Sequence, residues 1–216
     1  KQPAKFWIHT NMLTLNGKKM SKSTGNNILP NEIFSGKNDI FSKAYSPNVI
    51  RFFFLQAHYR NELDISESSL EASEKGFLRL IEIIDRLQNI KPIQKSNKEL
   101  MSFIKSWEKR CLECLNDDFN TPMLIAEIFN SSKIINEIEN KNEIGQSEKE
   151  YFLNLFDTFL NKILGLSYEK SNSKNDLILD VLLKIRNQAR VDKDYKISDK
   201  IRDELNKIGV KLNDND

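Results

Sequence analysis

The stretch from Asn97 to Leu115, NKELMSFIKSWEKRCLECL, places its apolar side chains at a helical spacing. Counted from Leu100, they fall at i, i+3, i+4, i+7, i+11, i+14 and i+15. These residues are Leu100, Phe103, Ile104, Trp107, Cys111, Cys114 and Leu115. Because an α-helix turns once in about 3.6 residues, these side chains share one face. The stretch therefore predicts an amphipathic helix with a single buried face.

Three further segments repeat this period. They are Ser66 to just before Pro92, Thr121 to Ile138, and Ser147 to Gly165. Thr121 followed by Pro122 is typical of a helix start, and Ser147 with Glu150 has the spacing of a capping box, with Ser147 as the N-cap. Four amphipathic helices in series predict a helical bundle.

The segments on either side of the bundle are shorter. In front, residues 6–15 form the only strand-like stretch of any length, and Leu13-Thr14-Leu15 leads into Asn16-Gly17, a strong hairpin signal. Two helices are expected next, from Pro30 to Phe34 and from Pro47 to His58.

A last pair of helices follows the aperiodic stretch 167–175. The first presents apolar residues from Leu177 to Ile185 on one side, and the second spans about Tyr195 to Lys207. The expected fold class is mainly α: a helical bundle plus a small C-terminal helical domain, with a short β element at the N-terminal end.

The charge balance of the chain is nearly neutral. Its 216 residues contain 33 Lys plus Arg and 31 Asp plus Glu, a net charge of +2. Nucleic-acid binding would therefore need local clustering of charge. The longest apolar stretch, Val49 to Ala57, falls short of the ~20 residues of a membrane span, and no secretory signal is visible. We expect no membrane partner and a cytoplasmic location.

Cys111 and Cys114 form an isolated C-x-x-C, the pattern of a redox pair or of half a zinc site. Both lie on the apolar stripe of a predicted helix, where a free Cys behaves as a small hydrophobic residue. The only histidines are His9 and His58, and no second C-x-x-C completes a tetrahedral set. We expect buried thiols, no metal site in this chain, and histidines that are packed or hydrogen-bonded.

The predicted hairpin is followed at once by the run KKMSKSTGN, residues 18–26. By itself, such a cluster is typical of a solvated basic loop. Lys19 and Lys22, interleaved with small hydroxyl residues and a glycine, also make a flexible clamp for a polyphosphate. Such a clamp is useful where negative charge grows during a reaction, as on a pyrophosphate leaving group.

Residues 19–23 read KMSKS, the second signature of class I aminoacyl-tRNA synthetases, without a mismatch. Other stretches resemble the cysteinyl-tRNA synthetase family in order and spacing. They are FWIH at 6–9, NVIRFF at 48–53 with HYR at 58–60, NDDFNTP at 116–122, and the residues from Ala189 to Leu205. The chain thus resembles the C-terminal portion of this family along essentially its whole length.

The resemblance implies a division into five parts. They are 1–28, the end of a Rossmann-type catalytic domain with the hairpin and KMSKS loop; 29–65, a stem-contact region; 66–166, a DALR-like helical bundle; 167–175, a linker; and 176–216, an anticodon-binding domain.

The resemblance also implies residue roles. Lys22 would contact the ATP phosphates and stabilise the transition state of adenylate formation, with Lys19 as the supporting cation. Met20, Ser21 and Ser23 complete the ATP-binding signature. The residues expected to face the GCA anticodon are Arg190, Tyr195, Asp199 and Arg202. Without the resemblance, the last set would be interpreted as an ordinary mixed-charge helix surface.

The family's HIGH signature and its zinc ligands would lie before Lys1. Since the chain starts with Lys1 rather than Met, we expect a piece of a longer enzyme that is inactive alone. The whole enzyme would use ATP with Mg²⁺, hold zinc, join cysteine to tRNA(Cys), and be a monomer. Two alternatives remain open: a cysteine ligase acting on a small amino sugar, and a non-catalytic helical RNA-binding module.

Overall fold

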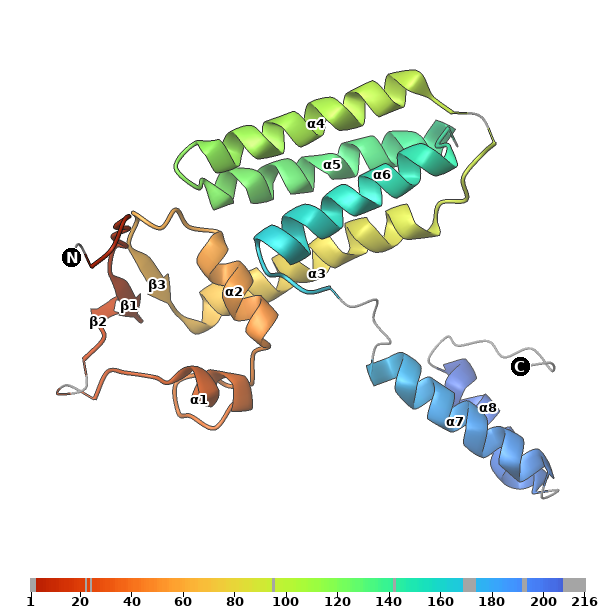
Figure 1. The fold of residues 1–216 in the computed structure, drawn as a ribbon. Helices are drawn as coiled ribbons and strands as arrows, with labels where there is room; N and C mark the ends of the chain where they lie inside the picture. The colour runs from red at the N-terminus through yellow and green to blue at the C-terminus, as the bar shows by residue number, and fades with distance from the viewer. Residues whose placement is uncertain are drawn as a thin grey trace. The chain divides into compact units, whose positions relative to one another are not determined.

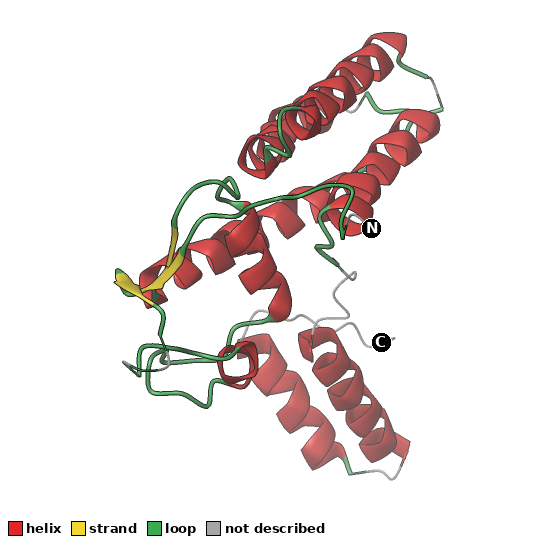
Figure 2. Cartoon of the chain, turned by 60° about the vertical axis from the view of Figure 1, so that its left-hand side comes forward, coloured by secondary structure: helices red, strands yellow, loops and turns green. Residues whose placement is uncertain are grey.

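The computed structural model describes residues 3–21, 23, 25–94, 96–141, 143–168, 174–191 and 194–207. The chain divides into two compact units, Lys1–Ser167 and Tyr168–Asp216. Helices dominate both units (Figure 1), and the strands form one small sheet in the larger unit (Figure 2). This confirms the expected mainly α fold class. No described helix has the length and apolarity that a membrane span requires.

The larger unit is built on four long helices that lie alongside one another (Figure 1). They are α3 (Glu67–Asn89), α4 (Lys98–Asn116), α5 (Thr121–Lys141) and α6 (Gln146–Phe156), the last continuing as the π-helical η1 (Asp157–Ile163). Trp107 of α4 is fully buried at their centre, with ring centroids 5.2 Å from Phe152, 5.4 Å from Phe156 and 5.8 Å from Phe159. The predicted bundle is confirmed.

The helix starts differ from the sequence prediction in detail: at α5, Asn120 Oδ1 accepts from the Met123 amide at 3.3 Å, whereas the Thr121 hydroxyl donates to Leu55 O at 2.8 Å. Asn97 Oδ1 accepts from the Leu100 amide at 3.0 Å, so Asn97 caps α4. The prediction that Ser147 caps the fourth helix is wrong, because α6 begins at Gln146 after Gly145. Ser147 Oγ instead donates to Glu148 Oε2 at 3.0 Å. Gly145, with extended backbone at φ −78° and ψ 166°, takes the N-cap position, so Ser147 lies inside the first turn of the helix.

Glu148 joins the starts of α4 and α6. Its carboxylate is fully buried and accepts from the Asn97 amide at 2.9 Å and from the Ser96 hydroxyl. Burial raises the pKa of Glu148, but the hydrogen bonds outweigh burial and hold the pKa below its ordinary value. The charged carboxylate thus holds the N-terminal ends of these two helices together.

The sheet has the strand order β2-β1-β3. Strand β1 (Leu13–Leu15) pairs antiparallel with β2 (Lys18–Lys19) across the Asn16-Gly17 turn, which confirms the predicted hairpin. Strand β3 (Leu63–Ile65) pairs parallel with β1 and was not predicted. The expectation of a strand through residues 6–12 is wrong, because the structure assigns no strand there. Only the end of this stretch is paired: the Asn11 amide donates to Tyr59 O at 2.9 Å, and Met12 O accepts from the Leu63 amide at 3.1 Å.

Two shorter helices connect the sheet to the bundle. Helix α1 spans Pro30–Ser35, and α2 spans Pro47–Leu55 with Ser46 as its N-cap. The predicted continuation of the second helix to His58 is wrong. The Gln56 amide donates to both Phe52 O and Phe53 O, a tightened last turn from which the chain leaves toward β3. Phe52 is fully buried against Phe77 of α3.

The smaller unit consists of α7 (Lys174–Val191) and α8 (Tyr195–Lys207), which pack on each other. The predicted span of the last helix is confirmed. The predicted apolar face of the preceding helix differs in the structure, since Val181 and Ile185 are about half exposed. The side chains of residues 174–180 lie outside the described part.

Candidate functional site

The hairpin presents its two lysines at one edge of the sheet. Thr14 pairs with Lys19 and Leu15 with Lys18, and both lysines are exposed. The turn places Asn16 at φ 52° and Gly17 at φ 71°. Two successive positive φ values are what a two-residue type I′ turn requires, and Asn-Gly adopts them at low cost. The local sequence therefore sets the geometry of this hairpin.

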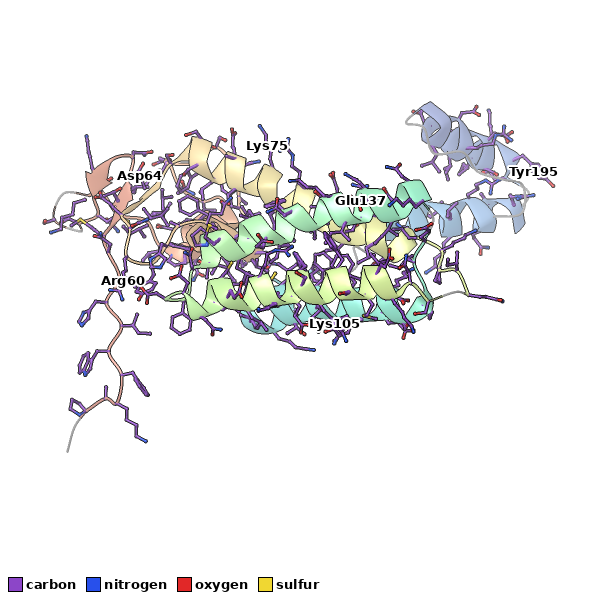
Figure 3. The ribbon with its side chains drawn as sticks, turned by 90° about the horizontal axis from the view of Figure 1, so that it is seen from above. Arg60, Asp64, Lys75, Lys105, Glu137 and Tyr195 are labelled. Carbon is purple, nitrogen blue, oxygen red and sulfur yellow. The ribbon has the colours of Figure 1, made fainter. Side chains whose placement is uncertain are left out.

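Asp64 of β3 holds the turn from the other side of β1. Its Oδ1 accepts from Thr14 Oγ1 at 2.6 Å and from the Gly17 amide at 2.7 Å. The Asn16 amide donates to Ile65 O at 2.9 Å. Sequence reasoning missed Asp64, because its role depends on a three-residue strand whose partner lies about fifty positions away. Figure 3 shows Asp64 and Arg60 toward the sheet end of the bundle, and Glu137 toward the opposite end.

The KMSKS signature begins with Lys19 at the end of β2 and continues beyond the strand through Met20 and Ser21. The Ser21 amide donates to Asn26 O at 2.9 Å, and the hydroxyls of Ser21 and Ser23 share a hydrogen bond of 2.8 Å. Gly25, at φ 70°, supplies the left-handed residue that turns the loop back. Lys22, the residue with the main predicted catalytic role, lies outside the described residues.

Asn26 closes the base of this loop. Its Nδ2 donates to Lys19 O at 3.1 Å and Lys18 O at 3.2 Å, and lies 3.5 Å from Leu15 O. Asn26 was part of the run noted in the sequence, but only the fold reveals its contacts. Together, exposed Lys19, half-buried Met20 and the paired serines make an open basic loop on an anchored base. Such a loop can approach a polyphosphate.

A second cluster joins the segment before β3 to the loop between α4 and α5. Asp118 accepts from the Tyr59 hydroxyl at 2.6 Å and from Arg60 Nε at 2.6 Å, and His58 Nε2 lies 3.8 Å away. The hydrogen bonds from Arg60 and Tyr59 hold the pKa of Asp118 at about 2. His58 is thus close to a carboxylate, a contact that its sequence neighbours did not indicate. Asp118 and Phe119 both have positive φ, at 51° and 54°.

We expect Asp118→Asn to remove a pH-dependent part of the stability. The folded pKa of about 2 is below the ordinary 3.8, so the carboxylate stabilises the fold above about pH 4, and this contribution is lost as the pH falls toward 2. Asn keeps the size and tolerates positive φ. We would measure the thermal unfolding midpoint of the variant and of the wild type from neutral pH down to pH 2. The midpoint of the variant should be lower than that of the wild type at neutral pH, and the difference should vanish at low pH. Asp117→Asn is the matched control, and a deficit independent of pH would contradict this role.

The four residues predicted to face an anticodon lie on α7 and α8. Arg190 and Tyr195 are exposed, Tyr195 by 61%. Arg202 Nη2 lies 3.0 Å from Asp199 Oδ1, so the structure pairs these two with each other. Just before α8, the Asp194 amide donates to Ala189 O at 2.8 Å.

The C-x-x-C lies inside the bundle, as expected. Both thiols are free; Cys111 is fully buried and Cys114 partly so. Burial raises the pKa of Cys111 to about 12, which makes the thiolate inaccessible at neutral pH. Among the residues that the structure describes, no three His, Cys, Asp or Glu side chains converge to hold a metal ion.

Comparison with known proteins bears directly on this geometry. Residues 1–75 match the family model of the class I (C) tRNA synthetase catalytic domain, and residues 110–169 match the DALR domain. Cysteine–tRNA ligases from Bacteroides fragilis and Porphyromonas gingivalis are 42% and 41% identical to this chain, in alignments of 215 and 216 positions that each cover 97% of the chain. The ligase from Chlorobaculum tepidum is 38% identical in an alignment of 221 positions, which also covers 97% of the chain.

This chain belongs to the cysteinyl-tRNA synthetase family. It spans less than half the length of the curated relatives it matches, 43% of the first two named and 42% of the third. The synthetase catalytic-domain match contains the KMSKS hairpin, Asp64 and Arg60, whereas the DALR match contains Asp118. The Arg60–Asp118 pair therefore connects the two family domains of this synthetase chain.

Proposed function

We propose that this chain works as part of a cysteine–tRNA ligase. The enzyme would join cysteine and ATP into cysteinyl-adenylate, releasing pyrophosphate, and transfer the cysteinyl group to tRNA(Cys). The observation that carries this proposal is the continuous similarity to cysteine–tRNA ligases over 97% of the chain. Because the chain covers 43% of that relative, other parts of the full-length protein would complete the active site.

In this proposal the hairpin serves the first step. As the cysteine carboxylate attacks the α-phosphorus of ATP, negative charge grows on the departing pyrophosphate. Lys22 and Lys19 would stabilise this charge, and Met20, Ser21 and Ser23 would shape the loop around the phosphates. ATP would enter as its Mg²⁺ complex. The anchored hairpin and the exposure of Lys19 support this role.

The smaller unit serves tRNA recognition in this proposal. Arg190 can donate two parallel hydrogen bonds to a base edge, and Tyr195 offers an exposed ring for stacking. Asp199 and Arg202 would act as a pair, since each already holds the other. The zinc implied by the family does not fit the described residues of this chain, so we derive no step through zinc. We propose a monomer.

The decisive experiment is amino-acid-dependent ATP–pyrophosphate exchange on the full-length protein. We expect exchange with cysteine and background exchange with serine or without an amino acid, because exchange requires reversible formation of the adenylate. Loss of cysteine dependence would overturn the proposal.

RNA binding distinguishes the proposed tRNA ligase from the alternative amino-sugar ligase. A filter-binding assay should favour tRNA(Cys) over an anticodon-altered version, and replacing Arg190 or Asp199 should weaken binding by ~1 to 3 kcal/mol at fixed salt. Cysteine ligation that does not depend on tRNA would support the amino-sugar alternative. No observation on this chain favours that alternative. Absent exchange with retained RNA binding would instead support the non-catalytic module.

A further inference from the structure

We propose that Asn26 is a positioning residue for the loop 20–25: its carboxamide locks the base of the loop and so sets where Lys22 enters the ATP site. This inference rests on the proposed function and deepens it. It assigns a role to a residue outside the KMSKS signature itself.

The hydrogen bonds of Asn26 carry the inference. Its side-chain nitrogen has two hydrogens, and the two nearest acceptors are Lys19 O at 3.1 Å and Lys18 O at 3.2 Å. The main chain is tied as well, because the Ser21 amide donates to Asn26 O at 2.9 Å. Asn26 therefore holds both the strand that leads into the loop and Ser21, two positions beyond the strand.

The strand that leads into the loop is short. Strand β2 contains only two residues, and Lys19 pairs with Thr14 at its last rung. Lys22 lies in the chain between Ser21 and Ser23, whose hydroxyls bond to each other. A cation acts on a leaving group only when it is held in the productive geometry. Opening the base would therefore misplace Lys22 without removing its charge.

The test compares Asn26→Asp with Asn27→Asp in the full-length protein. Asp has the size of Asn but places a carboxylate oxygen against the carbonyl oxygens of Lys18 and Lys19, so the base should open. Asn27 is exposed and its side chain makes no hydrogen bond to the residues that the structure describes. The two variants carry the same change of charge one position apart.

We expect Asn26→Asp to lower kcat for cysteine-dependent pyrophosphate exchange by roughly 10- to 100-fold. KM for cysteine should stay unchanged, and Asn27→Asp should resemble wild type. In a Lys22→Ala background, Asn26→Asp should add little further loss, because both changes remove the same stabilised charge. A kcat equal to that of Asn27→Asp, or full additivity with Lys22→Ala, would overturn the inference.

Limited trypsin digestion gives a readout that does not need activity. Trypsin cleaves after lysine, and we expect faster cleavage at Lys18, Lys19 and Lys22 in Asn26→Asp than in wild type or Asn27→Asp, with an unchanged thermal midpoint. Equal cleavage rates would refute the lock even if exchange fell. If wild type shows no cysteine-dependent exchange, the proposed function fails, and the digestion still decides the role of Asn26.

Discussion

Replacing Lys22 with Ala in the full-length protein is expected to lower cysteine-dependent pyrophosphate exchange by ~10² to 10³-fold. The physical reason is that a fixed ammonium group in a site shielded from water stabilises charge that develops on the leaving pyrophosphate. The ground state carries less of this charge at the leaving oxygen, so the loss should fall on kcat more than on KM for ATP.

The control for Lys22→Ala is Lys37→Ala. Lys37 is exposed, lies beyond α1 in the same catalytic-domain match, and has no place in the signature. Both changes remove one positive charge, so a general electrostatic effect on ATP attraction would lower both rates alike. Wild-type exchange in Lys22→Ala would remove this lysine from the mechanism.

Replacing Trp107 with Ala is expected to lower the free energy of unfolding by about 3 to 5 kcal/mol. The ring is fully buried among Phe152, Phe156 and Phe159, and its Nε1 donates to Glu127 O at 2.8 Å. Its removal leaves a cavity between α4, α5 and α6 that the surrounding rings fill only in part. Equilibrium urea unfolding followed by far-ultraviolet circular dichroism measures this loss.

The second tryptophan provides a matched control. Trp7 is 67% exposed in the extended N-terminal stretch, so Trp7→Ala should change the free energy of unfolding by less than about 0.5 kcal/mol. Equal effects of the two substitutions would show that burial at position 107 does not decide stability.

Local patterns predicted most of the helices, because the long helices carry their own apolar period. The buried face of α4 formed by Ile104, Trp107 and Cys111 and the Asn16-Gly17 turn depend on neighbours within a few residues, whereas Phe103 of the same predicted face is 50% exposed. Such features are set by backbone geometry and can be inferred without the fold. The capping prediction at Ser147 was wrong because Gly145, which forms a bridge with the distant Ile93, takes the N-cap position.

The sequence by itself determined the bundle, the hairpin and the basic signature that identify the family, since period, turn chemistry and motif are local properties of the chain. Only the tertiary structure placed Asp64 under the hairpin turn, turned the Asn26 carboxamide onto the loop base, and brought Asp118 to Arg60. The first and last of these contacts join residues 47 and 58 positions apart. Asn26 is near its partners in sequence, but its direction follows from the strand pairing. Hydrogen bonds of this kind need precise orientation in space, and no spacing along the chain encodes that orientation.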